Sequence, residues 1–266
     1  PAEADVPFLR ERAAEVQPDD LATIVYTSGT TGEPKGAELT HAHFDAVLTA
    51  TRRALPVEPG ARSIVFLPLA HSLQRTVLYR GLMEDVQGWF CGIPDLPEVI
   101  GLCRPTLLVS VPRMLEKIKA KAEAKAAARG ERAAAVFAWA IGVGRARAFL
   151  ARHGRRVPLT LRIQHRLADR LVLSKVRAGL GGELALIVSG GAALSVDVSD
   201  WFEAAGIAVR EGWGLTETCA PATTNTLDHV RPGTVGLPLA GVRIRLAEDA
   251  EIEVHSPGNF RGYHRD

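Results

Sequence analysis

Short β-branched and apolar runs alternate with segments of helical periodicity along most of this chain. Each run ends in a turn rich in glycine or proline, and this alternation is typical of an α/β protein whose strands are mostly parallel. We therefore expect a mostly parallel sheet with flanking helices over residues 21–215. The expected strands are residues 21–26, 64–69, 107–111, 184–188 and the start of a strand at 207–209.

The pattern changes after Pro221, where short strands at residues 242–246 and 251–254 are separated by glycines and prolines. This predicts a short antiparallel, β-rich part at the C-terminal end. Residues 1–20 are polar and punctuated by proline, and we expect a linker there. The predicted organisation is an α/β core over 21–221, with a basic helical insertion at about 113–178, and a β-rich segment of the same domain over 222–266.

Two helix starts are predicted from hydroxyl side chains. Thr40 is expected to cap a helix that begins at His41, and Ser195 is expected to cap another. In the second helix, Val198, Trp201, Phe202 and Ala205 recur at helical spacing, which predicts one buried stripe.

Positive charge is concentrated in one region, although the net charge of the chain is only +2. Residues 113–177 hold 17 Lys and Arg against 4 Asp and Glu. Such a region suits a set of solvated helix faces or contact with an anionic surface, and both interpretations remain open. Few aromatic residues interleave with these charges, so nucleic acid is not an expected partner.

Cysteine usage and hydropathy bear on location. Cys91, Cys103 and Cys219 are far apart and form no C-x-x-C pair, so neither a zinc ribbon nor a disulfide framework is expected. The longest clearly apolar run, residues 136–143, is short of the ~20 residues that a membrane span needs, and no basic-then-apolar leader opens the chain. We expect a cytoplasmic protein.

The strongest chemical signal is the run YTSGTTGEPKG at residues 26–36, which follows the first expected strand. Its glycines let backbone N–H groups approach an anion closely, and its hydroxyls and Lys35 add further donors and a positive charge. It is not a Walker A loop, because Lys35 precedes a glycine and is not followed by Ser or Thr. The run predicts a site for the phosphates of a nucleotide.

This run resembles the phosphate-loop signature of the adenylate-forming superfamily, which contains acyl-CoA synthetases, luciferases and the adenylation domains of nonribosomal peptide synthetases. Two further segments match in the same order. Residues 190–194, GGAAL, resemble the adenine-side turn, and residues 211–218, EGWGLTET, resemble the aromatic-Gly-x-Thr-Glu motif.

The pattern is most similar to that of long-chain fatty acyl-CoA synthetases. LPLAH at residues 67–71 looks like the histidine-bearing segment near the acyl pocket, and the long basic stretch followed by GGEL at 181–184 is similar to an insertion of that group. The resemblance implies that the chain is an incomplete large N-terminal domain of the adenylate-forming fold, with the small C-terminal domain absent.

The resemblance implies ATP-dependent conversion of a medium- to long-chain fatty acid to acyl-AMP, followed by thioester formation with coenzyme A. Catalytic roles fall to Lys35, Thr216, Glu217 and His71, and Glu217 with Thr27 would bind Mg²⁺. The implied nucleotide-binding residues are Thr27, Ser28, Gly29, Thr30, Thr31, Gly32, Lys35, Gly191, Ala192, Gly212, Trp213, Gly214 and Thr216.

Three functions stay open. The first is a ligase that transfers the acyl group to coenzyme A, and the second is a ligase that transfers it to the thiol of a carrier protein. The third is a non-catalytic module that binds a membrane or a partner through the basic helices. Peripheral contact of these helices with the inner face of a membrane is also compatible with an acyl-CoA synthetase, because fatty acids partition into bilayers.

Overall fold

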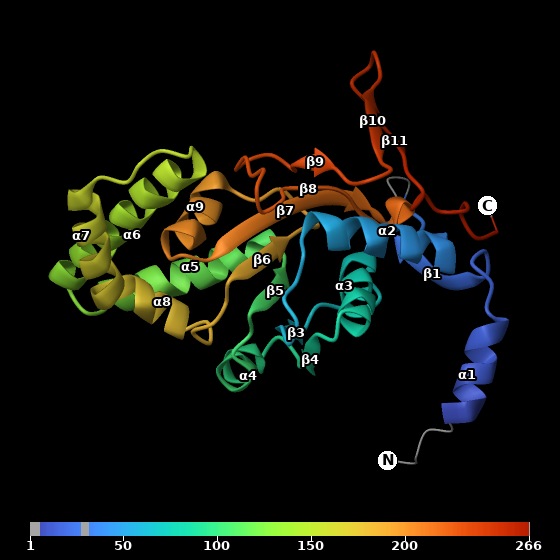
Figure 1. Cartoon of the computed structure of the whole chain (residues 1–266), viewed down its shortest axis with the longest axis horizontal. Coiled ribbons are helices and arrows are strands. Elements are labelled where there is room, and N and C mark those ends of the chain that lie inside the picture. Colours follow the sequence, from blue (N-terminus) through green and yellow to red (C-terminus); the bar gives the residue numbers. More distant parts are fainter. Residues whose placement is uncertain (1–5, 28–31, 266) are drawn as a thin grey trace.

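A parallel sheet forms the centre of the protein. The computed structural model describes residues 6–27 and 32–265, and its largest sheet has the strand order β5-β6-β7-β8-β9 (Figure 1). β5, β6 and β7 are parallel, whereas β8 and β9 continue the sheet antiparallel. Their bounds are Leu107–Ser110, Leu186–Ser189, Ala208–Leu215, Ala220–Thr224 and Leu237–Pro238.

A second parallel pair continues beside β5. β3 (Arg62–Val65) pairs with β4 (Gln87–Phe90), and the amide of Thr106 donates a 2.9 Å hydrogen bond to the carbonyl of Arg62. α3 (Ser72–Met83) connects β3 to β4, and α4 (Leu96–Cys103) connects β4 to β5. The predicted α/β architecture is confirmed, but the sequence did not predict α3, β4 or α4.

The first predicted strand is not part of the parallel sheet, and this corrects the expectation for residues 21–215. β1 (Leu21–Thr27) pairs antiparallel with β2 (Lys35–Thr40), which the sequence did not predict as a strand. Only Val25 of β1 is buried. The glycine- and threonine-rich run therefore connects two strands of a hairpin, and does not lead from a strand into a helix.

The predicted helix starts are observed. α2 (His41–Ala54) begins after Thr40, whose hydroxyl accepts from the amide of His43. α9 (Val196–Ala204) begins after Ser195, although the Ser195 side chain makes no capping hydrogen bond. Val198, Trp201 and Phe202 of the predicted stripe lie in the main core, and Ala205, directly after α9, is also buried.

The basic region forms a series of helices beside the sheet, and the breaks between them contain Gly130, Gly154 and Pro158. The helices are α5 (Pro112–Ala127), α6 (Glu131–Arg152), α7 (Leu159–Ala168), a π-helical turn (Asp169–Leu173) and α8 (Ser174–Ala178). Gly144 of α6 lies so close to α9 that a Cβ there would be 2.3 Å from the Ala204 carbonyl oxygen. This close approach fixes the basic helices against the core.

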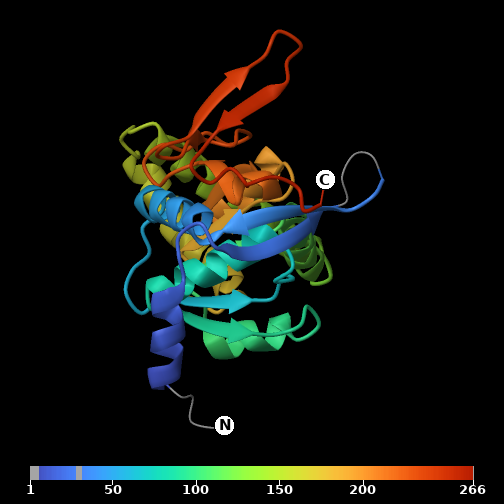
Figure 2. The same cartoon turned by 90° about the vertical axis from the view of Figure 1, so that its right-hand side faces the viewer.

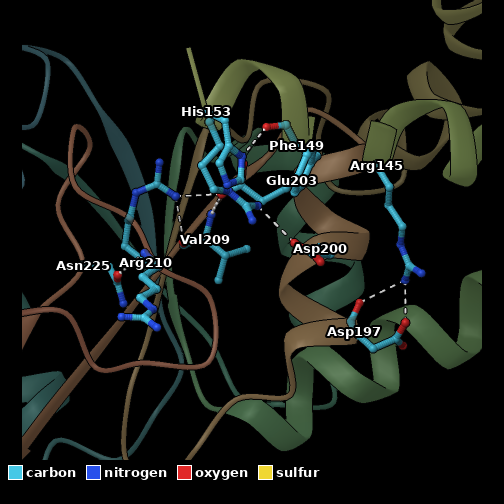
Figure 3. Close-up of polar contacts among 11 residues, drawn as sticks. Arg145, Phe149, His153, Asp197, Asp200, Glu203, Val209, Arg210 and Asn225 are labelled. Carbon is cyan, nitrogen blue, oxygen red and sulfur yellow. Dashed lines mark hydrogen bonds and ion pairs between the residues drawn. The ribbon is translucent and has the colours of Figure 1, made fainter. Parts of the chain in front are cut away.

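Acidic side chains of α9 neutralise part of the basic charge at this interface. Arg145 pairs with Asp197 at 2.6 Å, and Arg152 pairs with Asp200 at 3.0 Å. Glu203 pairs with Arg210 of β7 at 2.7 Å (Figure 3). The inward-facing arginines are therefore compensated within the fold.

In the described part of the chain, α6 is long and apolar enough to cross a membrane by length and composition. Helices of a packed core satisfy the same criterion. Ala140, Ile141, Val143 and Gly144 of α6 are buried against neighbouring elements, whereas 22% of its most apolar window is buried in all, so α6 packs on the fold through one side.

Two elements project from the rest. Within residues 1–20, the expected linker, Val6–Glu15 form helix α1, whose described side chains are exposed. At the other end, β10 (Arg243–Leu246) and β11 (Ile252–His255) form an antiparallel hairpin that extends away from the sheet (Figure 2). This hairpin and the β8–β9 pairing confirm the predicted antiparallel C-terminal part.

Candidate active site

A cavity of about 260 Å³ lies along α3 and beside β5 and β6, and it extends to the turn after β6 and to the end of β7. Carboxyl ends of parallel strands are where α/β proteins bind ligands. One part of its lining is apolar and comes from α3, the parallel strands and the segments that connect them to neighbouring elements. These apolar residues include Leu55, Val57, Val65, Val77, Leu78, Val86, Phe90, Leu107, Val109, Leu186 and Val188.

The other part of the lining is made by three segments that the sequence analysis singled out. His71 lies at the N-terminus of α3, and Gly190 and Gly191 follow β6. The third segment is the end of β7 and the start of the 3₁₀ turn η2 (Thr216–Thr218). It contributes Gly212, Trp213, Gly214 and Thr216 to the cavity. Residues far apart in sequence thus meet at one chamber.

Polar groups lie side by side at the carboxyl ends of the three parallel strands. Ser110, Ser189 and Glu211 are in register across β5, β6 and β7, and all are buried. The hydroxyls of Ser110 and Ser189 have no hydrogen-bond partner among the described residues. Ser189 is among the residues that line the cavity, although its side chain is fully buried.

Glu211 connects the Ser110–Ser189–Glu211 row to the turn at residues 190–194. The sequence did not predict this role for Glu211. Its Oε1 accepts a 2.8 Å hydrogen bond from the amide of Leu194, and its carbonyl accepts from the amide of Asn225. Burial raises the pKa of the Glu211 carboxyl, although the Leu194 hydrogen bond lowers it. The only sequence signal was its place as the first residue of the aromatic motif.

The predicted phosphate loop is the turn between β1 and β2. Thr27 and Lys35 are cross-strand partners at its base, and Gly32 has a φ of +95°, which favours glycine. Neither residue of this pair lines the cavity, and neither do Gly32, Ala192 or Glu217. The predicted nucleotide contacts at Ser28, Gly29, Thr30 and Thr31 lie outside the described residues.

Tyr263 joins the turn to the predicted metal ligand. Its hydroxyl donates a 2.8 Å hydrogen bond to Oε1 of Glu217, and Lys35 Nζ lies 5.0 Å from the centre of its ring. The amide of Phe260 also donates to the Glu217 carbonyl at 2.8 Å. Lys35 and Glu217 thus share one neighbour, although they come from opposite ends of the chain.

The same C-terminal segment is attached to the β1–β2 hairpin. The amide of Glu38 donates to the Gly262 carbonyl at 3.0 Å, and the amide of His264 donates to the Gly36 carbonyl at 2.7 Å. His264 Nδ1 lies 2.8 Å from Oε1 of Glu38. The sequence offered no signal for Tyr263, because the pairing joins residues 46 positions apart and follows no local period.

Tight backbone packing holds η2 beside the cavity. A Cβ on Gly214 would be 2.0 Å from the carbonyl oxygen of Ala220, so only glycine fits there. Cys219 and Ala220, just after η2, both have positive φ, 57° and 83°. Non-glycine residues reach this region at a cost, which indicates that the surrounding contacts hold this turn in place.

The Glu217 carboxylate and the hydroxyls near it suit a Mg²⁺ ion that is held mainly by phosphate oxygens and water. The described residues contain no group of three or more His, Cys, Asp and Glu side chains placed to bind a metal ion. Mg²⁺ at nucleotide sites is usually held by one or two carboxylates together with phosphate oxygens and water. A single carboxylate at Glu217, with hydroxyls nearby, fits that arrangement.

The comparisons with known proteins agree with this geometry. Residues 2–264 match the family model described as AMP-binding enzyme. The chain is 37% identical over its whole length to long-chain-fatty-acid–CoA ligase FadD15 of Mycobacterium bovis, covering 44% of that protein. It is 32% identical to long-chain-fatty-acid–CoA ligase 6 of Mus musculus, with 94% of this chain and 37% of that protein covered.

Solved structures give the same fold. O-succinylbenzoate coenzyme A synthetase from Bacillus subtilis, in complex with ATP and magnesium ion, matches 94% of this chain and 44% of its own, with a TM-score of 0.64 at 20% identity. An ATP-bound RpMatB-BxBclM chimera matches 94% of this chain and 42% of its own, with a TM-score of 0.64 at 27% identity.

The chain thus spans less than half the length of these curated relatives. The family model, however, matches nearly every residue of the chain, and the elements that line the cavity fall within the match. This chain belongs to the family of AMP-binding enzymes.

Proposed function

We propose that the intact protein carrying this chain activates a medium- to long-chain fatty acid with ATP and transfers the acyl group to coenzyme A. In the first step a carboxylate oxygen bonds to the α-phosphorus of ATP as the bond to pyrophosphate breaks. In the second step the thiol sulfur bonds to the acyl carbonyl carbon, the bond from that carbon to AMP breaks, and the thiol proton is released to solvent. The names of the curated relatives support this reaction class.

One observation carries the proposal. The cavity is lined by His71, the Gly190–Gly191 turn and the Trp213 segment, and its lining along α3 is mostly apolar, although the Arg80–Glu84 ion pair also lies there. A fatty acid has a polar carboxylate and an apolar chain. The lining by His71, the turn and the Trp213 segment would hold the reacting carboxylate and the nucleotide, and the apolar lining would exclude water from the chain.

The proposed residue roles concern charge compensation and positioning. An anionic carboxylate must approach a polyanionic phosphate, so fixed donors and cations contribute more than acid–base catalysis. Lys35 and the residue 27–32 turn would hold the outer phosphates, and Thr216 would donate to an oxygen of the α-phosphate. Gly191 and Ala192 would lie at the adenine, Trp213 beside the purine or the acyl chain, and His71 near the carboxyl group.

Mg²⁺ is part of the proposal. Glu217 would hold the ion with one carboxylate oxygen, and the Thr27 hydroxyl would be a second ligand. The bound ion would neutralise charge on the phosphate oxygens. The Tyr263 hydroxyl would keep the Glu217 carboxylate in one orientation while it does so.

ATP–pyrophosphate exchange by the intact protein tests the reaction. We expect exchange that requires Mg²⁺ and a fatty acid, and that falls strongly in Thr216→Val and Lys35→Ala. Glu248→Gln, at an exposed carboxyl in the loop before β11, is the control and should exchange normally. Absence of exchange with every fatty acid tried, with Mg·ATP present, would refute the proposal.

The acyl acceptor is tested separately. A carrier-protein thiol is the alternative to coenzyme A, and both share the first half-reaction. Coenzyme A and a phosphopantetheinyl carrier protein, supplied one at a time to the loaded enzyme, distinguish them. We expect release of AMP with coenzyme A, whereas release with the carrier alone would favour the alternative.

The proposed location is the cytoplasm, which suits three free cysteines in the described part of the chain. Peripheral contact with the inner face of a membrane, through the basic helices, belongs to the same proposal.

A further inference from the structure

The outward side of α7 carries an apolar stripe that no residue described in the structure covers. Leu159, Ile163, Leu167 and Leu171 recur every four residues, so they lie on the same side of this helical segment. Their exposed fractions are 69%, 59%, 50% and 41%. Ala168, on the opposite side, is fully buried. The helix therefore buries one side in the core and presents a second apolar side to its surroundings.

Arginines accompany this stripe. Arg162, Arg166 and Arg170 also recur every four residues on the exposed side of the same segment, and Arg155 and Arg156 precede it. None of these five guanidinium groups makes an ion pair with any residue that the structure describes. Arg145 and Arg152 at the α9 interface differ, because Asp197 and Asp200 compensate them (Figure 3).

We propose that the α7 outer face, formed by these four apolar residues and five arginines, docks on the surface of an anionic lipid bilayer. A helix with an apolar stripe beside a cationic one lies in the plane of such a surface. Its apolar side chains enter the headgroup boundary, and its cations attract the anionic lipids. Membrane contact is thereby assigned to the α7 outer face alone and not to all the basic helices. This contact does not depend on the ligase reaction proposed above.

The position of α7 in the fold suits this role. α7 lies at one end of the molecule, away from the β1–β2 hairpin and from both ends of the chain (Figure 1). The face carries no carboxylate apart from Asp169, which pairs with Arg177 at 2.8 Å. A surface with cations and no uncompensated acid is complementary to anionic headgroups, whereas a second copy of the same face would be repelled by it.

Co-sedimentation of the intact protein with vesicles tests the proposal. We expect binding to vesicles of phosphatidylcholine mixed with phosphatidylglycerol, weaker binding to phosphatidylcholine alone, and a loss of binding as salt is raised. Arg162→Gln/Arg166→Gln should weaken binding roughly 30-fold, given the typical contribution of each cation near such a surface. Ile163→Ser/Leu167→Ser should weaken it by at least about 10-fold, because less apolar area is buried.

The matched control removes the same charge from another basic helix. Lys121→Gln/Lys125→Gln on α5 changes two exposed lysines and should leave binding within about twofold, because neither lysine belongs to the α7 outer face. Circular dichroism shows whether each variant folds, and ATP–pyrophosphate exchange reports separately on the ligase proposal.

Three outcomes would overturn the inference. The first is no binding to anionic vesicles by the unaltered protein. The second is an equal loss of vesicle binding in the α5 control variant, which would mean that general charge attraction, and not one docking face, holds the protein on the vesicle. The third is an oligomer, detected by light scattering, that the Ile163→Ser/Leu167→Ser variant dissociates while vesicle binding is unchanged, which would assign the stripe to a protein interface.

Discussion

The hydroxyl of Tyr263 donates a 2.8 Å hydrogen bond to Oε1 of Glu217, and its ring lies 5.0 Å from Lys35 Nζ. A residue of the C-terminal segment therefore orients a carboxylate and contacts a cation that the proposed reaction needs. This arrangement makes Tyr263 a positioning residue, with separate roles for its hydroxyl and its ring.

Tyr263→Phe should slow acid-dependent pyrophosphate exchange by about 10- to 100-fold, because a hydrogen bond to a charged group typically contributes ~1.5–3 kcal/mol. The ring and its contact with Lys35 remain, so the KM for ATP should change little. The Mg²⁺ concentration needed for half-maximal rate should rise, since the Glu217 carboxylate is less well oriented. A merely structural role would not shift that Mg²⁺ dependence.

Tyr79→Phe is the matched control for this prediction. Tyr79 packs edge-on against Phe44 at 5.0 Å between ring centres, in the same core cluster as part of the β1–β2 hairpin. It should keep the Mg²⁺ dependence of the unaltered protein. An unchanged Mg²⁺ dependence in Tyr263→Phe would contradict the positioning role.

Gly214→Ala should destabilise the protein and abolish most exchange activity. The new Cβ would lie 2.0 Å from the Ala220 carbonyl oxygen, so the β7–β8 turn that presents Thr216 and Glu217 must shift. The cost in free energy of unfolding should reach at least about 1–3 kcal/mol, the usual cost of overpacking. Thermal or urea denaturation followed by circular dichroism measures it.

Gly142→Ala is the same chemical change as Gly214→Ala, but we expect it to raise the stability of the protein. Gly142 is an exposed residue in α6, and a Cβ there would have no atom within 4 Å. This variant should be more stable by about 0.5–1 kcal/mol, because alanine loses less conformational freedom in a helix. Equal destabilisation by both substitutions would show that the close contact at Gly214 is not the cause.

Glu211→Gln should alter how stability depends on pH. Burial raises the pKa of the Glu211 carboxyl, so the folded protein holds this proton more tightly than the unfolded chain does. Its favourable contribution is therefore complete below the unfolded pKa and is lost as pH rises through the raised folded pKa. Glutamine has no such titration, and its side-chain oxygen can still accept from the Leu194 amide.

Urea denaturation across an acid-to-neutral pH series measures this effect. We expect Glu211→Gln to be at least as stable as the unaltered protein at neutral pH, with an advantage that shrinks in acid. Loss of stability that is the same at every pH would indicate that packing, and not ionisation, dominates at this position.

The thiol of Cys219 should resist alkylation in the folded protein. Burial raises its pKa to about 12, so almost no reactive thiolate is present near neutral pH. Cys91 is partly exposed, although burial raises its pKa as well. Mass spectrometry after treatment with iodoacetamide should find Cys91 modified first, and Cys219 modified only after denaturation. Rapid native labelling of Cys219 would contradict the packing after η2.

The sequence alone determined the local features of this protein. Alternating apolar and helical patterns specified the α/β class, and Thr40 specified the start of α2 because capping is a contact between neighbouring residues. The periodic spacing of Val198, Trp201 and Phe202 specified the buried side of α9 for the same reason. The motifs that mark the AMP-binding family were likewise read from short contiguous runs.

The tertiary structure decided how distant segments meet. β1 pairs with β2 in place of joining the parallel sheet, and Tyr263 reaches Glu217 across 46 positions of sequence. No periodic pattern in the sequence predicts either pairing, because each depends on which chain segments the packed core brings together. The stripe of Leu159, Ile163 and Leu167 shows the same point. Its spacing is visible in the sequence, but only the packing of Ala168 into the core decides that the stripe faces outward.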